Sequence, residues 1–97
     1  MIAVIFKAEI AELDDEYFST AIRLRDLAIN EYGCSKFISS TEGNQELAIS
    51  YWPSKSHIAA WHSNPEHVVA QNKGKTKWYK SFHVQVTEVQ SEYGSGT

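Results

Sequence analysis

The residues best suited to chemistry in this 97-residue chain gather in one stretch, Tyr51 to Tyr79, which holds all three tryptophans and three of the four histidines. His57 and Trp61 are four residues apart, so on a helix their side chains share one face. An imidazole with a pKa of about 6.5 in an aromatic cavity can take a proton from a phenol or enol. Tryptophan walls exclude water and stack on planar ligands. The pair therefore predicts a site for a small planar aromatic molecule.

A second group of polar and aromatic residues follows on the next predicted helix. His67, Gln71 and Trp78 share one face of it, with His67 and Gln71 one turn apart. Both helical faces are expected to line one pocket. The alternative is that Trp52, Trp61 and Trp78 are core residues and that the histidines make ordinary surface or capping hydrogen bonds. The residues by themselves leave both interpretations open.

Charge and hydropathy exclude two classes of partner. Nine basic against twelve acidic side chains give a net charge of -3 and a pI of 5.7, which is unfavourable for binding a phosphate backbone, so no nucleic-acid partner is expected. No run approaches the roughly 20 apolar residues that span a bilayer, so no membrane association is expected either. The default prediction is a cytoplasmic protein.

The sequence also lacks the residue patterns of metal sites and cofactor sites. His57, His62 and His67 recur every five residues, which turns successive side chains by about 140° on a helix and disperses them, so no metal site is predicted. There is no dinucleotide-binding or phosphate-binding glycine motif. The one cysteine, Cys34, has no disulfide partner and no neighbouring base, which indicates a structural role.

The first half of the chain predicts a strand, a helix and a hairpin. Apolar residues alternate through the first ten positions, which is typical of a strand. Asp14 and the acidic residues after it begin a helix of about 18 residues that ends at Gly33. The stretches 34–42 and 45–52 are strand-like, and Gly43 and Asn44 between them suit a tight turn. These two strands are therefore expected to pair antiparallel.

The second half predicts two helices and a last strand. Ser54 can cap a short helix that carries His57 and Trp61. Asn64 followed by Pro65 is a strong start signal for a longer helix, predicted to reach about Lys80. The alternation from Phe82 through Val89 predicts the fourth strand, and residues 94–97 are expected to form a frayed end.

Strand, helix, strand, strand, helix, strand is the order of an α+β, ferredoxin-like βαββαβ fold, with a four-stranded antiparallel sheet and both helices on one face. At 97 residues this is one domain, residues 1–97. The opposite sheet face would be left bare although it carries apolar residues. Because neither disulfides nor metal can stabilise so small a chain, a homodimer formed by packing two such faces together is predicted.

The stretch around the histidines resembles a known family. The pattern S-Y-W-P-S-x-x-x-I-x-A-W-x-x-x-P-E-H-x-x-A-Q-x-x-G-x-x-x-W-Y, from Ser50 to Tyr79, is similar to the antibiotic biosynthesis monooxygenase domain, and to a subgroup of small, mostly uncharacterised bacterial proteins within it. The resemblance implies a dimeric α/β barrel. It also implies oxidation of polycyclic phenols or quinols by molecular oxygen with no metal or flavin, the substrate anion being the reductant.

Three positions of this chain correspond to functional positions of the family. Trp61 matches the active-site tryptophan, and His57 stands one turn earlier where family members place a polar residue. Haem-degrading relatives have an axial histidine at the position of Gln71, and an amide is a poor iron ligand. His67, one turn before Gln71, is the nearest substitute in this chain.

The leading hypothesis is a cofactor-independent monooxygenase for a small phenol or quinol. In it His57 and Trp61 are catalytic, and the substrate is bound by Trp52, His67, Gln71 and Trp78. The second hypothesis is a non-catalytic dimer that binds a small apolar ligand, because one fold can host many functions. The third is a haem-degrading monooxygenase.

Overall fold

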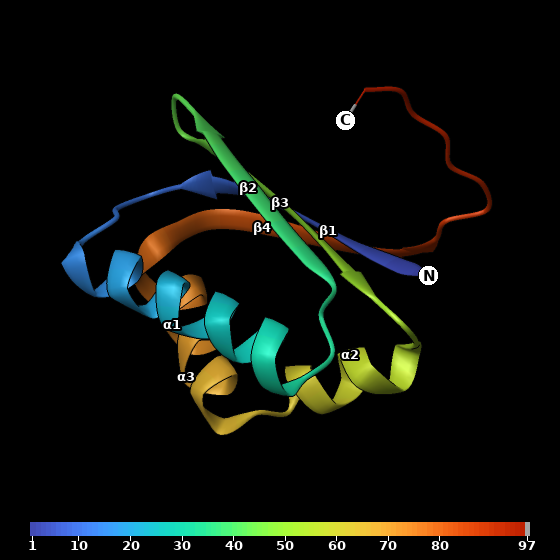
Figure 1. Ribbon diagram of the computed structural model, residues 1–97. Helices are drawn as coiled ribbons and strands as arrows, with labels where there is room; N and C mark the ends of the chain where they lie inside the picture. The colour runs from blue at the N-terminus through green and yellow to red at the C-terminus, as the bar shows by residue number, and fades with distance from the viewer. Residues whose placement is uncertain (97) are drawn as a thin grey trace.

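The computed structural model describes residues 1–96 and is built on one antiparallel sheet of four strands (Figure 1). β1 (Ile2–Ile10) is central and pairs with β3 and β4, and the order across the sheet is β2-β3-β1-β4. The other strands are β2 (Lys36–Glu42), β3 (Gln45–Trp52) and β4 (Tyr79–Glu88). This order and the antiparallel pairing confirm the predicted ferredoxin-like α+β fold.

The helices lie together on one face of the sheet, as predicted (Figure 1). They are α1 (Asp15–Glu31), α2 (Lys55–His62) and α3 (Pro65–Lys73). Each begins where the sequence has a capping residue: the side chains of Asp14, Ser54 and Asn64 accept hydrogen bonds from backbone N–H groups of the first turn. These caps fix where each helix leaves its loop, and so where its side chains point.

The predicted helix from Asn64 to Lys80 is too long. α3 ends at Lys73 and is followed by one π-helical turn, η1 (Gly74–Trp78), that closes with a hydrogen bond from the N–H of Tyr79 to the carbonyl of Gly74. Tyr79 then begins β4, three residues earlier than predicted, and pairs with Ile10 across a register shift. Wide turns of this kind are rare and occur mostly as single turns. Here the turn coincides with the burial of Trp78.

The core lies between the helices and the half of the sheet formed by β1 and β3. Ile2, Trp52 and Trp61 are buried there with Leu27 and Ala28 of α1. Cys34 is also buried in this cluster, and its thiol donates to the carbonyl of Lys36 at 3.3 Å. Burial raises the pKa of this thiol, which agrees with the structural role that the sequence predicted.

The face of the sheet opposite the helices carries an apolar group on its three neighbouring strands. Strand register places Ile5, Ile38, Leu47 and Ile49 there, and Ile38 and Leu47 are each at least 40% exposed. His83 of β4 pairs with Lys7 and lies on this face too. This is the surface that the predicted homodimer would bury.

The remaining segments add little regular structure. Val89 follows β4 and donates to the carbonyl of Met1 at 3.0 Å, and residues 90–96 have no regular secondary structure. The last position of the predicted frayed end, residue 97, lies outside the described residues. Within residues 1–96, no helix combines the length and the apolar character that crossing a membrane requires.

Candidate functional site

Three of the predicted site residues form one aromatic stack. The ring of His67, on α3, lies on the indole of Trp61, with centroids 4.6 Å apart and planes inclined by 15°. Trp61 in turn stacks on Trp52 of β3 at 6.3 Å, and Tyr32 packs against it at 5.1 Å. Trp52 is fixed by its own hydrogen bond, from Nε1 to the hydroxyl of Ser50 at 2.8 Å. The stack therefore runs from the sheet, through α2, to α3.

The junction of α2 and α3 brings His67 onto this stack. Asn64 caps α3 by accepting from the N–H groups of Glu66 and His67, at 2.9 and 3.1 Å. The Asn64 side chain also donates to the hydroxyl of Tyr32 at 2.8 Å, which ties the junction to the end of α1. The Asn64 cap, which the sequence predicted, thus sets where α3 begins and places His67 in its first turn.

Gln71, which the sequence predicted to bind substrate, lies against His62 and His67. Its amide nitrogen donates to the carbonyl of His62 at 2.9 Å and lies 3.2 Å from Nδ1 of His67. Burial and the neighbouring His62 lower the pKa of His67 to about 4. Because its folded-state pKa lies below its unfolded value, His67 stabilises the fold above about pH 6.5, and that contribution is lost as pH falls towards about 4.

An apolar strip on β4 continues from the stack. Strand pairing places Val84 and Val86 on the same sheet face as Trp52, and Val86 pairs with Val4, which packs against the core containing Trp52 and Trp61. Val84 and Val86 are 46% and 49% exposed. The helix layer thus leaves this half of its own sheet face uncovered. The strip is therefore an exposed apolar surface beside the core that contains the stack.

The structure does not bring His57 into this stack. Its Nδ1 lies 2.7 Å from the hydroxyl of Ser54, the residue that caps α2. The other side of the ring packs against the backbone at Gly33, where an added Cβ would lie 2.8 Å from Cδ2 of His57. His57 and Trp61 share a helix as predicted, but the serine cap and the close approach at Gly33 hold the imidazole at the α1–β2 loop.

This contact gives a stability prediction. Gly33 has φ +84°, so Gly33→Ala should cost about 1–2 kcal/mol in backbone strain, and about 1 kcal/mol more by displacing His57 from Ser54. Gly43→Ala is the matched control, because Gly43 has φ +60° with open space around it and should show the strain alone. The measurement is urea unfolding of both variants. In a His57→Ala background the two costs should become equal, and a persisting difference would show that His57 is not the obstacle.

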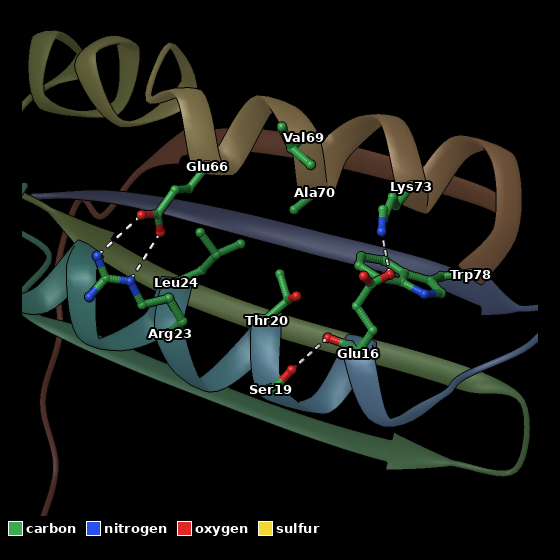
Figure 2. Close-up of a pocket in the computed structure, with 10 residues that line it drawn as sticks. All are labelled: Glu16, Ser19, Thr20, Arg23, Leu24, Glu66, Val69, Ala70, Lys73 and Trp78. Carbon is green, nitrogen blue, oxygen red and sulfur yellow. Dashed lines mark hydrogen bonds and ion pairs between the residues drawn. The ribbon is translucent and has the colours of Figure 1, made fainter.

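Trp78 also lies apart from the stack. It is buried at the other end of the helix layer, 5.2 Å from the ring of Tyr17, and it lines a cavity of about 470 Å³ between α1 and α3 (Figure 2). Ion pairs join the two helices there, Arg23 with Glu66 at 3.0 Å and Lys73 with Glu16. This cavity is lined by Trp78 but not by Trp61, His67 or Gln71, so the residues predicted to line one pocket do not all meet in it.

The sequence interpretation missed a buried polar cluster beside Trp78. The hydroxyl of Tyr79 donates to that of Tyr17 at 3.1 Å, and Glu46 of β3 is buried on the same sheet face, bonded to Thr41. Burial raises the pKa of both tyrosines, and the charge of Glu46 raises it further. Strand alternation could have shown that Glu46 faces the helices, because it lies six residues before Trp52.

The described side chains show no arrangement for binding a metal ion. Across residues 1–96, no three His, Cys, Asp or Glu side chains converge on a common point. Gln71 uses its amide nitrogen in the contacts with His62 and His67.

Comparison with solved structures identifies the fold. The chain superimposes on SnoaB, a cofactor-independent oxygenase from Streptomyces nogalater, with a TM-score of 0.80, 10% identity and coverage of 97% of each chain. Rv0793 from Mycobacterium tuberculosis gives 0.81 at 12% identity, covering 96% of this chain and 98% of that one. A structure described as an antibiotic biosynthesis monooxygenase gives 0.73 at 12% identity, with 94% and 100% covered. At these identities the likeness establishes the fold that the chain shares with these proteins.

Sequence comparison places the chain among its relatives. No protein-family model matches it. The uncharacterised protein YqjZ of Bacillus subtilis (strain 168) is 36% identical to it over 88 residues, which make up 90% of this chain and 77% of YqjZ. Identity at this level over nearly the whole chain means that the protein belongs to the same family as YqjZ.

Proposed function

We propose that this chain is the protomer of a homodimeric, cofactor-independent monooxygenase that oxidises a small planar phenol or quinol with molecular oxygen. The observation that carries the proposal is the Trp52–Trp61–His67 stack beside the uncovered strip of β4. It combines one neutral imidazole, supported by a buried aromatic stack, with an exposed apolar strip, and a small-molecule site is expected to join polar and apolar groups in this way. The likeness in fold to SnoaB, an oxygenase without a cofactor, supports the same activity.

The chemistry uses the electrons of the substrate. In converting a phenol to a quinone, or a quinol to a hydroxyquinone, one oxygen atom of O2 replaces hydrogen on a ring carbon. The other oxygen atom leaves as water with the hydrogens of that C–H and of the phenol O–H. The phenol supplies all four electrons, and its anion gives them up more readily than the neutral molecule. A site that stabilises the phenolate therefore promotes the reaction without a metal or flavin.

The residues of the stack can stabilise such an anion. Trp61 is buried beneath the ring of His67 and Trp52 beneath Trp61, so the two indoles support the imidazole. The exposed side chains of Val84 and Val86 offer an apolar surface for the ring system of the substrate. His67 remains uncharged at neutral pH, because its pKa is lowered to about 4, and it can donate a hydrogen bond from its ring to the substrate oxygen. His57, the base predicted from the sequence, contacts Ser54 and Gly33 instead.

The open face of the sheet supports the homodimer. Ile5, Ile38, Leu47 and Ile49 form an apolar group on neighbouring strands, and a second copy packed through the same face would cover both groups at once. Such packing leaves the helix-side face, which carries the stack and the β4 strip, available in each protomer.

Oxygen uptake tests the proposal. The purified protein, treated with a chelator, is mixed with hydroxynaphthoquinol-type substrates in an oxygen electrode, and quinone formation is followed by absorbance. We expect protein-dependent uptake above the background autoxidation, with one quinone that has gained an oxygen atom formed per O2 and no hydrogen peroxide released. We also expect an unchanged rate in His57→Ala. A loss of rate in His57→Ala would instead make His57 the base.

Two other results would contradict the proposal. Thermal stabilisation by the same compounds without oxygen uptake would indicate a small-ligand-binding protein. A shifted Soret band on stoichiometric addition of haem, with no quinol oxidation, would indicate the haem-degrading function.

A further inference from the structure

The side-chain amide of Gln71 is oriented by the backbone carbonyl of His62, which can only accept a hydrogen bond. Its nitrogen lies 2.9 Å from the backbone carbonyl of His62, and a carbonyl oxygen has no proton to donate. The amide nitrogen, and not the amide oxygen, must therefore face this junction. The same nitrogen lies 3.2 Å from Nδ1 of His67, and its second N–H is free to point there.

The hydrogen bond from Gln71 determines which ring nitrogen of His67 carries the proton. A neutral imidazole carries one proton, and the nitrogen that accepts a hydrogen bond is the one without it. If Nδ1 accepts from Gln71, the proton is on Nε2, at the edge of the ring away from Nδ1. Within residues 1–96, Trp78 Nε1 is the one buried side-chain nitrogen or oxygen without a hydrogen-bond partner. Nε2 of His67 is therefore not a buried atom left without a partner.

We propose that Gln71 is a positioning residue that holds His67 in the tautomer with the proton on Nε2, so that this N–H is presented to an anionic oxygen of the substrate. The tautomer is a property of the free protein. Its use in stabilising a phenolate rests on the function proposed above.

The competing partner of His67 is the carbonyl of Trp61. This carbonyl lies close enough to the imidazole to raise its pKa slightly, and it would favour a proton on the nitrogen that faces it. It also accepts from the N–H of Asn64 at 3.0 Å, which occupies one of its two lone pairs. The second N–H of Gln71 has no acceptor other than Nδ1 among the described residues. A bond to Nδ1 gives that N–H a partner within the protein, which favours the bond from Gln71.

The tautomer matters for the choice of substrate. A neutral imidazole N–H stabilises a developing oxyanion without being acidic enough to protonate it, whereas an imidazolium would return a proton and quench the anion. The class of substrate that fits is therefore one whose oxygen becomes negatively charged as it loses electrons, a phenol or an enol, rather than an ether or an unactivated arene.

Nitrogen-15 NMR of the free protein tests the tautomer directly. In wild type at neutral pH we expect the ring signals of His67, identified by their absence in His67→Phe, to show a protonated Nε2 and an unprotonated Nδ1, and to remain those of a neutral ring well below pH 6. Gln71→Glu should reverse the tautomer and raise the pKa, because a carboxylate accepts from a protonated Nδ1. Gln90→Glu introduces the same charge in the exposed segment after β4 and should leave the His67 signals unchanged.

A protonated Nδ1 in wild type, or the same tautomer in wild type and Gln71→Glu, would overturn the proposal. Activity supplies a separate readout. If wild type oxidises quinols, Gln71→Glu should lower kcat/KM by about 10²-fold and shift its pH profile, while Gln90→Glu should not. The expected tautomer without oxygen uptake in wild type would leave the positioning role in place and reject the monooxygenase instead.

Discussion

Trp52→Ala is expected to lower the free energy of unfolding by about 3–5 kcal/mol, the largest stability effect of any single change considered for this chain. Trp52 is 1% exposed and is the largest fully buried side chain. It packs with Ile2 of β1 and with Leu27 and Ala28 of α1, and it supports the indole of Trp61. Small domains have only about 5–15 kcal/mol in total, so the variant would be close to unfolding at ambient temperature.

Two companion variants make this result interpretable. Trp52→Phe keeps most of the buried volume but loses the hydrogen bond to Ser50. We expect it to lower the free energy of unfolding by only about 1–2 kcal/mol, because it leaves a small cavity and removes one hydrogen bond. Phe18→Ala removes an aromatic ring that is 53% exposed and should cost less than about 1 kcal/mol. Urea unfolding at one fixed protein concentration measures all three. A similar cost for Trp52→Ala and Phe18→Ala would show that the core does not depend on Trp52.

His67→Phe is expected to lower kcat/KM for quinol oxidation by about 10²–10³-fold, the range typical of losing one preorganised hydrogen-bond donor at a developing oxyanion. Phenylalanine keeps the planar contact with Trp61, so the stack should persist while the N–H is lost. Because the interaction is strongest with the anion that reacts, most of the loss should appear in kcat rather than in KM.

His57→Ala is the comparison for this variant. It removes an imidazole from the same segment of the chain, but one that lies against Ser54 and Gly33. The oxygen-electrode assay is run on both variants after circular dichroism has shown that they are folded. Equal activity in wild type and His67→Phe would remove His67 from the reaction.

The fold could be predicted from the sequence because its signals are local. Strand alternation gave β1, and the hairpin turn at Gly43 and Asn44 joins β2 and β3 as expected. The caps at Asp14, Ser54 and Asn64 begin the helices where the sequence placed them. The end of α3 was not predictable in the same way, because the π-helical turn of η1 accompanies the burial of Trp78 against Tyr17, a residue 61 positions earlier in the chain.

The sequence by itself therefore determined the elements, their order and the short list of residues suited to chemistry, because hydrophobic period and helix caps act over a few neighbouring positions. The tertiary structure alone decided which of those residues meet. His57 and His67 have the same intrinsic chemistry, but a serine cap and the backbone at Gly33 hold the first, while Trp61 and Gln71 surround the second. Burial then keeps His67 neutral, and burial depends on contacts between segments that are distant in the sequence.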